Sequence, residues 1–299
     1  MQTCLISAVC TPLKDDSSLD VDGLAAHLED QWRHGISGVL IGGTMGIMQL
    51  LPDKTYRELV QHGTRLAHGC GEVLVGAGDT SLIRTMERVR FVEQWDVDGI
   101  VVLSPFFLTL GQDDLLAYFR EVADRSRKPI YLYDLPGTTK TKLSLETVLQ
   151  LSEHPNIHGI KCSGDWVDTW RLIHRVDRAF RVVPAQPQMV DLLVRCGVAC
   201  NLDGIFAVAP GLTACIVEAA EQGEYARAAS LQGKMCELLK LVLTKYPLFP
   251  ACSAFLQAKG ISGNVFVPPT RPLSPKQREQ FLAEPLVVEL LTGPEAAMR

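Results

Sequence analysis

Long hydrophobic runs are missing from this sequence of 299 residues, although apolar residues make up 47 % of it. No run reaches the roughly 18–20 residues that a membrane-spanning helix needs, so we expect no membrane segment. The first residues, Met1–Leu5, do not show a basic region followed by an apolar one, so we expect no secretory signal peptide. These absences favour a cytoplasmic protein.

Basic clusters are also missing. The formal net charge is −5, and Lys and Arg form neither a block nor a stripe along the chain. A nucleic-acid partner is therefore not expected. The total does not constrain the charge of a small-molecule substrate, because a single basic pocket changes it very little.

Metal-binding motifs are absent, although the chain has nine cysteines. Cys196 and Cys200 are four residues apart, but no second pair with the spacing of a zinc site accompanies them. His154 and His158 are separated by Pro155, which breaks any shared helical face. We therefore expect free thiols in a reducing compartment and no metal site.

Neither nucleotide-binding glycine motif occurs, since the chain has no G-x-G-x-x-G and no G-x-x-x-x-G-K-[ST]. Instead, short and almost continuously apolar runs alternate with amphipathic helical patterns, as expected for parallel strands covered on both faces. The eight runs cover residues 4–9, 38–41, 73–77, 99–103, 129–133, 157–161, 181–183 and 199–206. Eight strand–helix units predict an α/β protein with a closed (β/α)₈ TIM barrel, in preference to an open Rossmann-type sheet.

The pattern changes after the eighth run. Four helical patterns follow, and a Gly/Pro-rich stretch precedes the last of them. These patterns cover residues 211–222, 224–245, 250–259 and 275–291. The first of the four completes the barrel. We therefore predict a barrel over residues 1–224 that carries the active site, and a C-terminal helical domain over residues 225–299.

One lysine stands at the end of a predicted buried strand. The apolar run Asn156–Lys161 ends in this ammonium group, and burying such a charge without a partner is costly. The same desolvation can keep a lysine amine neutral and nucleophilic toward carbonyl groups. The preceding strand run ends in a phenol, Tyr133. A lysine and a phenol at the ends of consecutive strands indicate imine chemistry.

Other groups reach the same end of the predicted barrel, because active sites of this fold lie at the carboxyl ends of the strands. Thr44 follows the second strand, and the backbone N–H groups of the turn Gly43–Gly46, at an expected helix entrance, suit a carboxylate. Ser104, Phe107 and Leu202 also stand at strand ends or just beyond them. The candidates for contacts with a second substrate are Ser163, Asp165, Gln186 and Asp203.

The chain resembles the dihydrodipicolinate synthase/N-acetylneuraminate lyase family of pyruvate-type class I aldolases over nearly its whole length. The segments that carry the resemblance are Ala8–Pro12, Gly43–Gly46, Ser104-Pro105, Tyr133–Pro136, Gly159–Lys161 and Arg271–Leu273. The resemblance implies that Lys161 forms a Schiff base with a 2-oxo acid and that Tyr133 is the general acid/base. It also implies that Thr44 helps to hold the substrate carboxylate and connects to the tyrosine.

Substrate-binding positions are implied in the same way for Gly43, Met45, Phe107, Thr138 and Leu202, and several of them depart from the family pattern. Met45 replaces a hydroxyl residue and Phe107 replaces a tyrosine. Thr138 replaces the arginine that dihydrodipicolinate synthases use for the carboxylate of their second substrate. Met45 and Phe107, together with Ile47 in place of a glutamate, are interpreted either as core residues or as the lining of a more apolar pocket.

Asp134 stands where the family has an asparagine, and we interpret it as a residue that shapes the turn after the strand rather than as a base.

The resemblance implies a Schiff-base-forming aldolase or lyase that acts on pyruvate or another 2-oxo acid, with an aldehyde as a possible second substrate. Two alternatives stay open: a dehydratase of 2-keto-3-deoxy sugar acids that uses the same imine, and a barrel that binds a keto acid without turnover. No metal or organic cofactor is expected, because the lysine imine is itself the electron sink. Family analogy implies a homo-oligomer, either a dimer or a tetramer.

Overall fold

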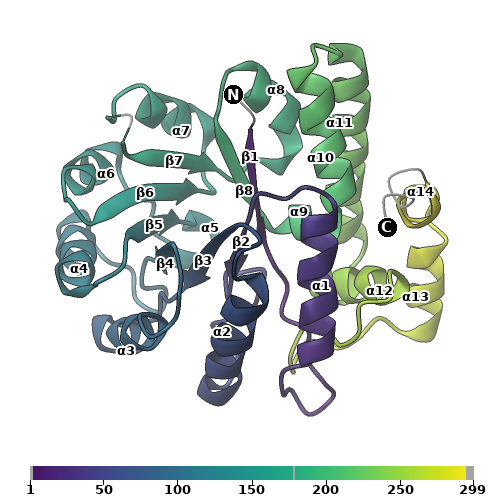
Figure 1. Cartoon of the computed structure of the whole chain (residues 1–299), viewed down its shortest axis with the longest axis horizontal. Coiled ribbons are helices and arrows are strands. Elements are labelled where there is room, and N and C mark those ends of the chain that lie inside the picture. The colour runs from purple at the N-terminus through teal and green to yellow at the C-terminus, as the bar shows by residue number, and fades with distance from the viewer. Residues whose placement is uncertain (1–2, 178, 294–299) are drawn as a thin grey trace. The chain divides into compact units, whose positions relative to one another are not determined.

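The computed structural model describes residues 3–177 and 179–293, and its contacts divide the chain into two compact units. The first unit combines the chain up to Gly71 with the part from Pro187 onward, and the second covers Glu72–Gln186. Both are drawn in Figure 1. Each unit is described by itself.

The second unit contains five parallel strands that pair in chain order. They are β3 (Glu72–Gly76), β4 (Gly99–Leu103), β5 (Ile130–Asp134), β6 (Ile157–Cys162) and β7 (Arg181–Pro184). The helices α3 (Leu82–Val92), α4 (Gln112–Arg125), α6 (Leu145–Ser152) and α7 (Trp166–Ile173) lie along the outer side of these strands (Figure 1). All five residues of β4 are buried, as expected for a strand covered on both faces.

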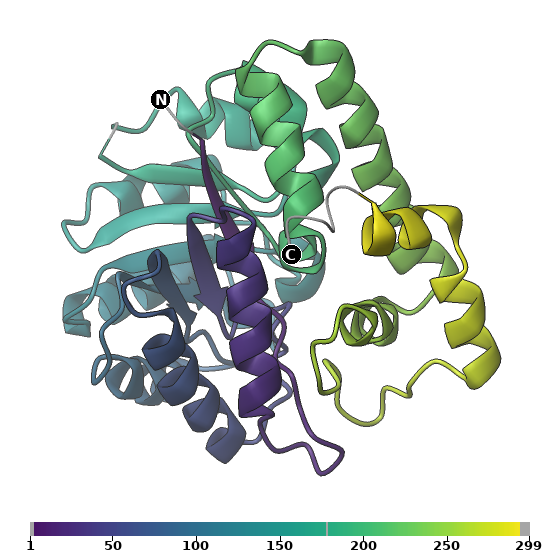
Figure 2. The same cartoon turned by 45° about the vertical axis from the view of Figure 1, so that its right-hand side comes forward.

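In the first unit, β1 (Cys4–Ala8) lies between β2 (Gly38–Ile41) and β8 (Cys200–Asp203), again in parallel. Its helices are α1 (Val21–Arg33), α2 (Asp53–Ala67), α8 (Val190–Arg195), α9 (Gly204–Val208), α10 (Pro210–Glu221) and α11 (Tyr225–Lys240). A π-helical turn, Leu241–Lys245, extends α11, and α12 (Leu248–Ala258), α13 (Pro275–Leu282) and α14 (Pro285–Thr292) follow. Figure 2 shows α10 and α11 side by side, with the last three helices in yellow-green and yellow.

The eight predicted strands are all present, they are parallel, and helices separate them in the order expected for a (β/α)₈ barrel. Helices α12–α14 form the expected C-terminal extension. The domain boundary at residue 224 stays a prediction, and residues 294–299 of the predicted helical domain lie outside the described residues. Within residues 3–177 and 179–293, no helix combines the length and hydropathy needed to cross a membrane.

The eighth apolar run covers residues 199–206, and the strand within it ends at Asp203, one of the two residues expected at its end. The Asp203 carboxylate accepts a hydrogen bond from the Ile205 N–H and begins α9 there. Two expectations about other elements were wrong. The last helical pattern is two helices, since a new helix begins at Pro285. The turn at Gly43–Gly46 is not a helix entrance, because α2 begins only at Asp53.

A buried cluster of charged and titratable groups joins α1 to the end of α12 within the first unit. Lys259 forms an ion pair with Asp30, and both side chains are almost fully buried. His27, one turn before Asp30, is fully buried, and its Nε2 accepts a hydrogen bond of 3.2 Å from the Cys10 N–H. Burial lowers the pKa of His27 from 6.5 to about 4. His27 is therefore neutral in the folded protein near pH 7.

Protonation of His27 is expected to make the folded protein less stable in acid. The histidine takes up a proton near pH 6.5 when the chain is unfolded but only near pH 4 when it is folded. The stability that neutral His27 contributes is therefore fully present above pH 6.5. The free energy of unfolding falls by about 3 kcal/mol as the pH falls from 6.5 toward 4. Urea denaturation at pH 7.5, 5.5 and 4.5 measures this loss.

The matched control for this titration is His27→Gln, whose amide oxygen can still accept the Cys10 N–H but does not titrate. The difference in unfolding free energy between wild type and His27→Gln should shrink over the same pH range. A difference that does not change with pH would contradict the assignment.

Gly159 is expected to be essential for the strand that carries Lys161. A Cβ atom at Gly159 would overlap the carbonyl oxygen of Arg181 on β7 and lie 3.0 Å from Tyr131 Cδ1 on β5. Gly159→Ala should therefore destabilise the protein by about 1–3 kcal/mol, because strands on both sides must shift. Gly233→Ala is the control: nothing lies within 4 Å of its Cβ position in α11, and the change should stabilise by about 1 kcal/mol. The urea denaturation midpoints of the two variants measure these changes in stability. Equal changes in both variants would contradict the special role of Gly159.

Candidate active site

The pairing of β5 with β6 brings Tyr133 and Lys161 together. The two residues are direct neighbours in the parallel register, so their side chains leave the same face of the sheet. Lys161 is only 5 % exposed, and its Nζ lies 4.0 Å from the centre of the Tyr133 ring. Tyr133 is buried to a similar degree. A buried amine therefore lies against a phenol ring at the carboxyl end of two adjacent strands.

Ser163 is the hydrogen-bond partner of this amine. Lys161 Nζ donates to Ser163 Oγ at 2.9 Å, and the Ser163 N–H donates to the Asp134 carbonyl oxygen at 2.9 Å. The sequence placed Ser163 near the site as a possible substrate contact, but this contact to the lysine was not anticipated. Ser163 is two residues after Lys161, so the backbone must turn beyond β6 before the hydroxyl can reach the amine.

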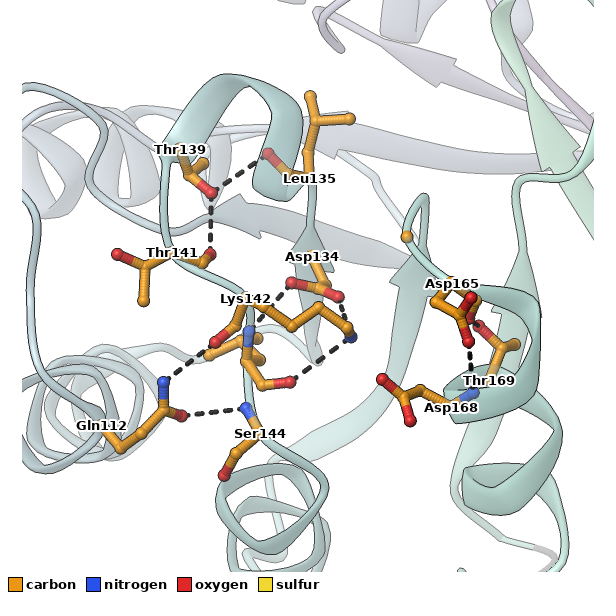
Figure 3. Close-up of polar contacts among 12 residues, drawn as sticks. Gln112, Asp134, Leu135, Thr139, Thr141, Lys142, Ser144, Asp165, Asp168 and Thr169 are labelled. Atoms are coloured by element: carbon orange, nitrogen blue, oxygen red, sulfur yellow. Dashed lines mark hydrogen bonds and ion pairs between the residues drawn. The ribbon is translucent and has the colours of Figure 1, made fainter.

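Asp134 lies on the opposite face of the sheet from Tyr133. It pairs with Cys162, and successive residues of a strand alternate between faces. The Asp134 carboxylate is fully buried, forms an ion pair with Lys142 and accepts a hydrogen bond of 3.0 Å from the Leu143 N–H (Figure 3). Burial, with the Asp134 charge as a smaller cause, raises the pKa of the Cys162 thiol to about 12. These contacts agree with the interpretation that Asp134 shapes the turn.

Thr138 and Phe107, both implied as substrate-binding residues, lie in the second unit with exposed side chains. Thr138 is in the short helix α5 (Pro136–Thr139), which directly follows β5 and which the sequence did not predict. Phe107 follows β4, and its side chain is 74 % exposed. Of the two interpretations of Phe107, a core residue within the chain is therefore excluded.

Three other strand-end candidates have structural partners. The Asp165 carboxylate accepts the Asp168 N–H at 3.1 Å and thereby caps α7 (Figure 3). Asp203 caps α9 in the same way. Gln186 Nε2 donates to the Gly164 carbonyl oxygen at 2.6 Å.

The glycine turn after β2 lies in the first unit. Gly43 packs closely, since a Cβ there would lie 3.0 Å from Leu40 Cδ2. Thr44 is the residue of interest, because its Oγ1 is buried and has no hydrogen-bond partner among the described residues. A buried hydroxyl without a partner is costly, which favours a bound polar group there.

Met45 and Leu202 are both buried in this first unit. Met45 packs against Gly204, where a Cβ would approach the Met45 Cβ to 2.8 Å, and Leu202 is in β8. Ile47 has a φ of 50°, which is unusual for a β-branched residue and costs roughly 1–3 kcal/mol. The backbone is therefore strained at Ile47, just after the Gly43–Gly46 turn.

No group of three or more His, Cys, Asp or Glu side chains within residues 3–177 and 179–293 has the arrangement of a metal site. Cys196 is exposed and Cys200 is buried, and neither forms a disulfide.

The sequence model of the dihydrodipicolinate synthetase family matches residues 1–284. The curated relatives include a 4-hydroxy-tetrahydrodipicolinate synthase from Limosilactobacillus fermentum, 30 % identical over 93 % of this chain and 89 % of the relative. Another, from an Exiguobacterium species, is 26 % identical over 95 % of this chain and 97 % of the relative.

Solved structures of the same family share the fold. A prophage protein of the dihydrodipicolinic acid synthase family from E. coli K12, in complex with pyruvate, has a TM-score of 0.87 at 24 % identity and covers 96 % of this chain and 98 % of its own. Dihydrodipicolinate synthase from Acinetobacter baumannii, also with pyruvate, has a TM-score of 0.85 at 22 % identity, with 100 % and 99 % coverage. The predicted (β/α)₈ barrel is confirmed, and the chain belongs to the dihydrodipicolinate synthetase family.

Proposed function

We propose that this protein is a class I aldolase or lyase that forms a Schiff base between Lys161 and a 2-oxo acid such as pyruvate. The single observation that carries the proposal is the buried Lys161 amine against the Tyr133 ring at paired strand ends. The two solved family members that are described as complexes with pyruvate support the same class of substrate.

The reaction begins with attack of the neutral Lys161 amine on the C2 carbonyl carbon of the 2-oxo acid. The carbinolamine loses water to give a protonated imine, which withdraws electrons from the adjacent C3–H bond. Loss of a proton from C3 gives an enamine, whose C3 attacks an aldehyde carbon while the aldehyde oxygen takes up a proton. Water then hydrolyses the imine and frees Lys161. Cleavage of a longer 2-oxo acid follows the same steps in reverse.

Tyr133 is proposed to carry protons to and from the oxygen lost from the carbinolamine. The phenol belongs to the same strand pair as the amine, and general acid–base catalysis of this kind typically contributes roughly 10²–10⁴-fold. Thr44 is proposed to hold the carboxylate of the 2-oxo acid, since its hydroxyl is buried without a hydrogen-bond partner among the described residues. Gly43, Met45, Phe107, Thr138 and Leu202 are proposed to contact the substrate.

The second half of the reaction is proposed to differ from dihydrodipicolinate synthesis. Thr138 stands at the position where dihydrodipicolinate synthases have an arginine for the carboxylate of the second substrate. Its exposed hydroxyl suits a hydroxylated substrate better than an anion. This residue also supports the second candidate function, dehydration of a 2-keto-3-deoxy sugar acid through the same imine. The products separate the two reactions: an aldolase releases pyruvate and an aldehyde from such an acid, and a dehydratase releases water.

Borohydride trapping with pyruvate tests the imine. Reduction should add the pyruvate-derived group to Lys161, because borohydride converts the imine to a stable secondary amine. Mass spectrometry of the digested protein locates the adduct. Lys161→Ala should abolish both the adduct and turnover, whereas Tyr133→Phe should slow imine formation by roughly 10²-fold or more.

The matched control is Lys142→Arg, which changes a neighbouring lysine and should keep the adduct on Lys161. An adduct on another lysine, or none with any 2-oxo acid, would rule out the proposed function and favour a barrel that binds without turnover.

We also propose that the protein is a homo-oligomer. Phe107 and the next residue, Leu108, are 74 % and 64 % exposed, and two adjacent exposed apolar side chains favour burial against a partner. The double variant Phe107→Asp/Leu108→Asp should therefore have a smaller molar mass than wild type by light scattering. Ile83→Asp is the control, since Ile83 on α3 is equally exposed at 74 %. A wild-type mass equal to one chain would contradict the proposal.

A further inference from the structure

The segment from Leu135 to Leu143, called here the β5 turn, is fastened at its base by a buried charge. Asp134 precedes it, and both carboxylate oxygens point back to its far end: Oδ2 to the Lys142 ammonium and Oδ1 to the Leu143 N–H at 3.0 Å (Figure 3). The Asp134 side chain is fully buried and that of Lys142 is 35 % exposed. The buried carboxylate needs both partners. Without Lys142 its charge would be unpaired, and without the Leu143 N–H one of its oxygens would have no hydrogen bond.

A second side chain fastens the outer side of the β5 turn. Gln112, at the start of α4, donates from Nε2 to the Lys142 carbonyl oxygen at 2.9 Å. Its Oε1 accepts from the Ser144 N–H at 2.9 Å and from Thr147 Oγ1 at 2.7 Å. Within the turn, Thr139 Oγ1 lies 3.1 Å from the carbonyl oxygens of Leu135 and Thr141, which share its single hydroxyl proton (Figure 3). The backbone on both sides of the tip is therefore fixed.

The tip itself is left open. Gly137 and Thr138 are exposed, and apart from its chain neighbours and the backbone of α5, no described residue lies within 4 Å of a Cβ at Gly137. A segment whose base is this firmly held while its tip stays exposed is suited to contact another molecule. Thr138 offers a hydroxyl that can both donate and accept a hydrogen bond.

The same base is connected to the reacting amine. Asp134 directly follows Tyr133, and its carbonyl oxygen accepts the Ser163 N–H at 2.9 Å. Ser163 Oγ in turn accepts from Lys161 Nζ at 2.9 Å. The turn therefore begins where the amine and the phenol lie, and Thr138 at its tip is only a short stretch of chain beyond Tyr133.

We propose that the Asp134–Lys142 ion pair positions the β5 turn so that its tip receives the distal, hydroxylated part of a long 2-oxo acid. Asp134 and Lys142 are then positioning residues, and the inference rests on the proposed imine at Lys161. Pyruvate ends one carbon beyond its carbonyl and has no hydroxylated distal part for the tip to receive. The ion pair should matter for long substrates and not for pyruvate.

The test compares borohydride trapping at Lys161 by pyruvate and by 2-keto-3-deoxygluconate, a six-carbon hydroxylated 2-oxo acid. The readout is the concentration of each acid that gives half-maximal trapping. The main variant is Asp134→Asn/Lys142→Met, which removes both charges together and so avoids a stranded buried charge, while the amide oxygen that replaces the carboxylate can still accept the Leu143 N–H. Lys140→Met is the matched control, because Lys140 is an exposed lysine of the same turn whose side chain makes no described contact with Asp134.

In the double variant, the half-maximal concentration of 2-keto-3-deoxygluconate should rise at least about tenfold and that of pyruvate by less than about twofold. Amide hydrogen exchange over residues 135–144 should accelerate while the thermal midpoint stays near that of wild type. Lys140→Met should match wild type in all three measurements.

Equal changes for both acids, or no change for either, would overturn the inference, as would trapping of the wild type by pyruvate but not by the longer acid. Failure of the wild type to be trapped by either acid would instead remove the proposed function on which the inference rests. The single variant Lys142→Met distinguishes a loss of stability from a loss of positioning. It should unfold at a lower temperature than the double variant, because the buried Asp134 carboxylate then has no cation beside it.

Discussion

The parallel pairing of β5 with β6 is the constraint on which the site depends. It sets Tyr133 beside Lys161 and Asp134 beside Cys162. Because side chains alternate between the faces of a strand, the amine and the phenol share one face, and the carboxylate and the thiol share the other. A slip of one residue in either strand would separate both pairs. The groups proposed to react and the groups that support them are therefore fixed by the same register.

The two lysines near these strand ends have different surroundings. Lys142 is paired with the Asp134 carboxylate. The described contacts of Lys161, the Tyr133 ring and the Ser163 hydroxyl, are both uncharged. An amine that must lose its proton before it attacks a carbonyl carbon is better served by uncharged neighbours than by a carboxylate. The surroundings therefore favour Lys161 over Lys142 as the nucleophile.

The sequence was sufficient to predict the strands and the Lys161–Tyr133 pair, because near-continuous apolar runs and strand-end positions follow from local pattern. The contacts of Asp134 could not be predicted, since its partners Lys142 and Leu143 are eight and nine residues away across an unpredicted helix. The exposure of Phe107 also has no local signal, because an apolar residue after a strand is equally typical of core and of surface.

The residues that the sequence predicts are those proposed to form the imine, and the residues that it does not predict are those proposed to recognise the distal part of the substrate. Imine formation needs an amine and a phenol at fixed separation, and paired strand ends supply this because neighbouring strands hold each other in register. Recognition of the distal part of a substrate depends on turns, whose conformation is set by side chains distant in sequence. Here one such turn is held by an ion pair between the buried Asp134 and the partly exposed Lys142, where the family has a neutral asparagine in place of Asp134. In the proposed role, exchanging that pair would alter the turn and leave the strand register in place, so that substrate preference changes while the proposed imine chemistry is kept.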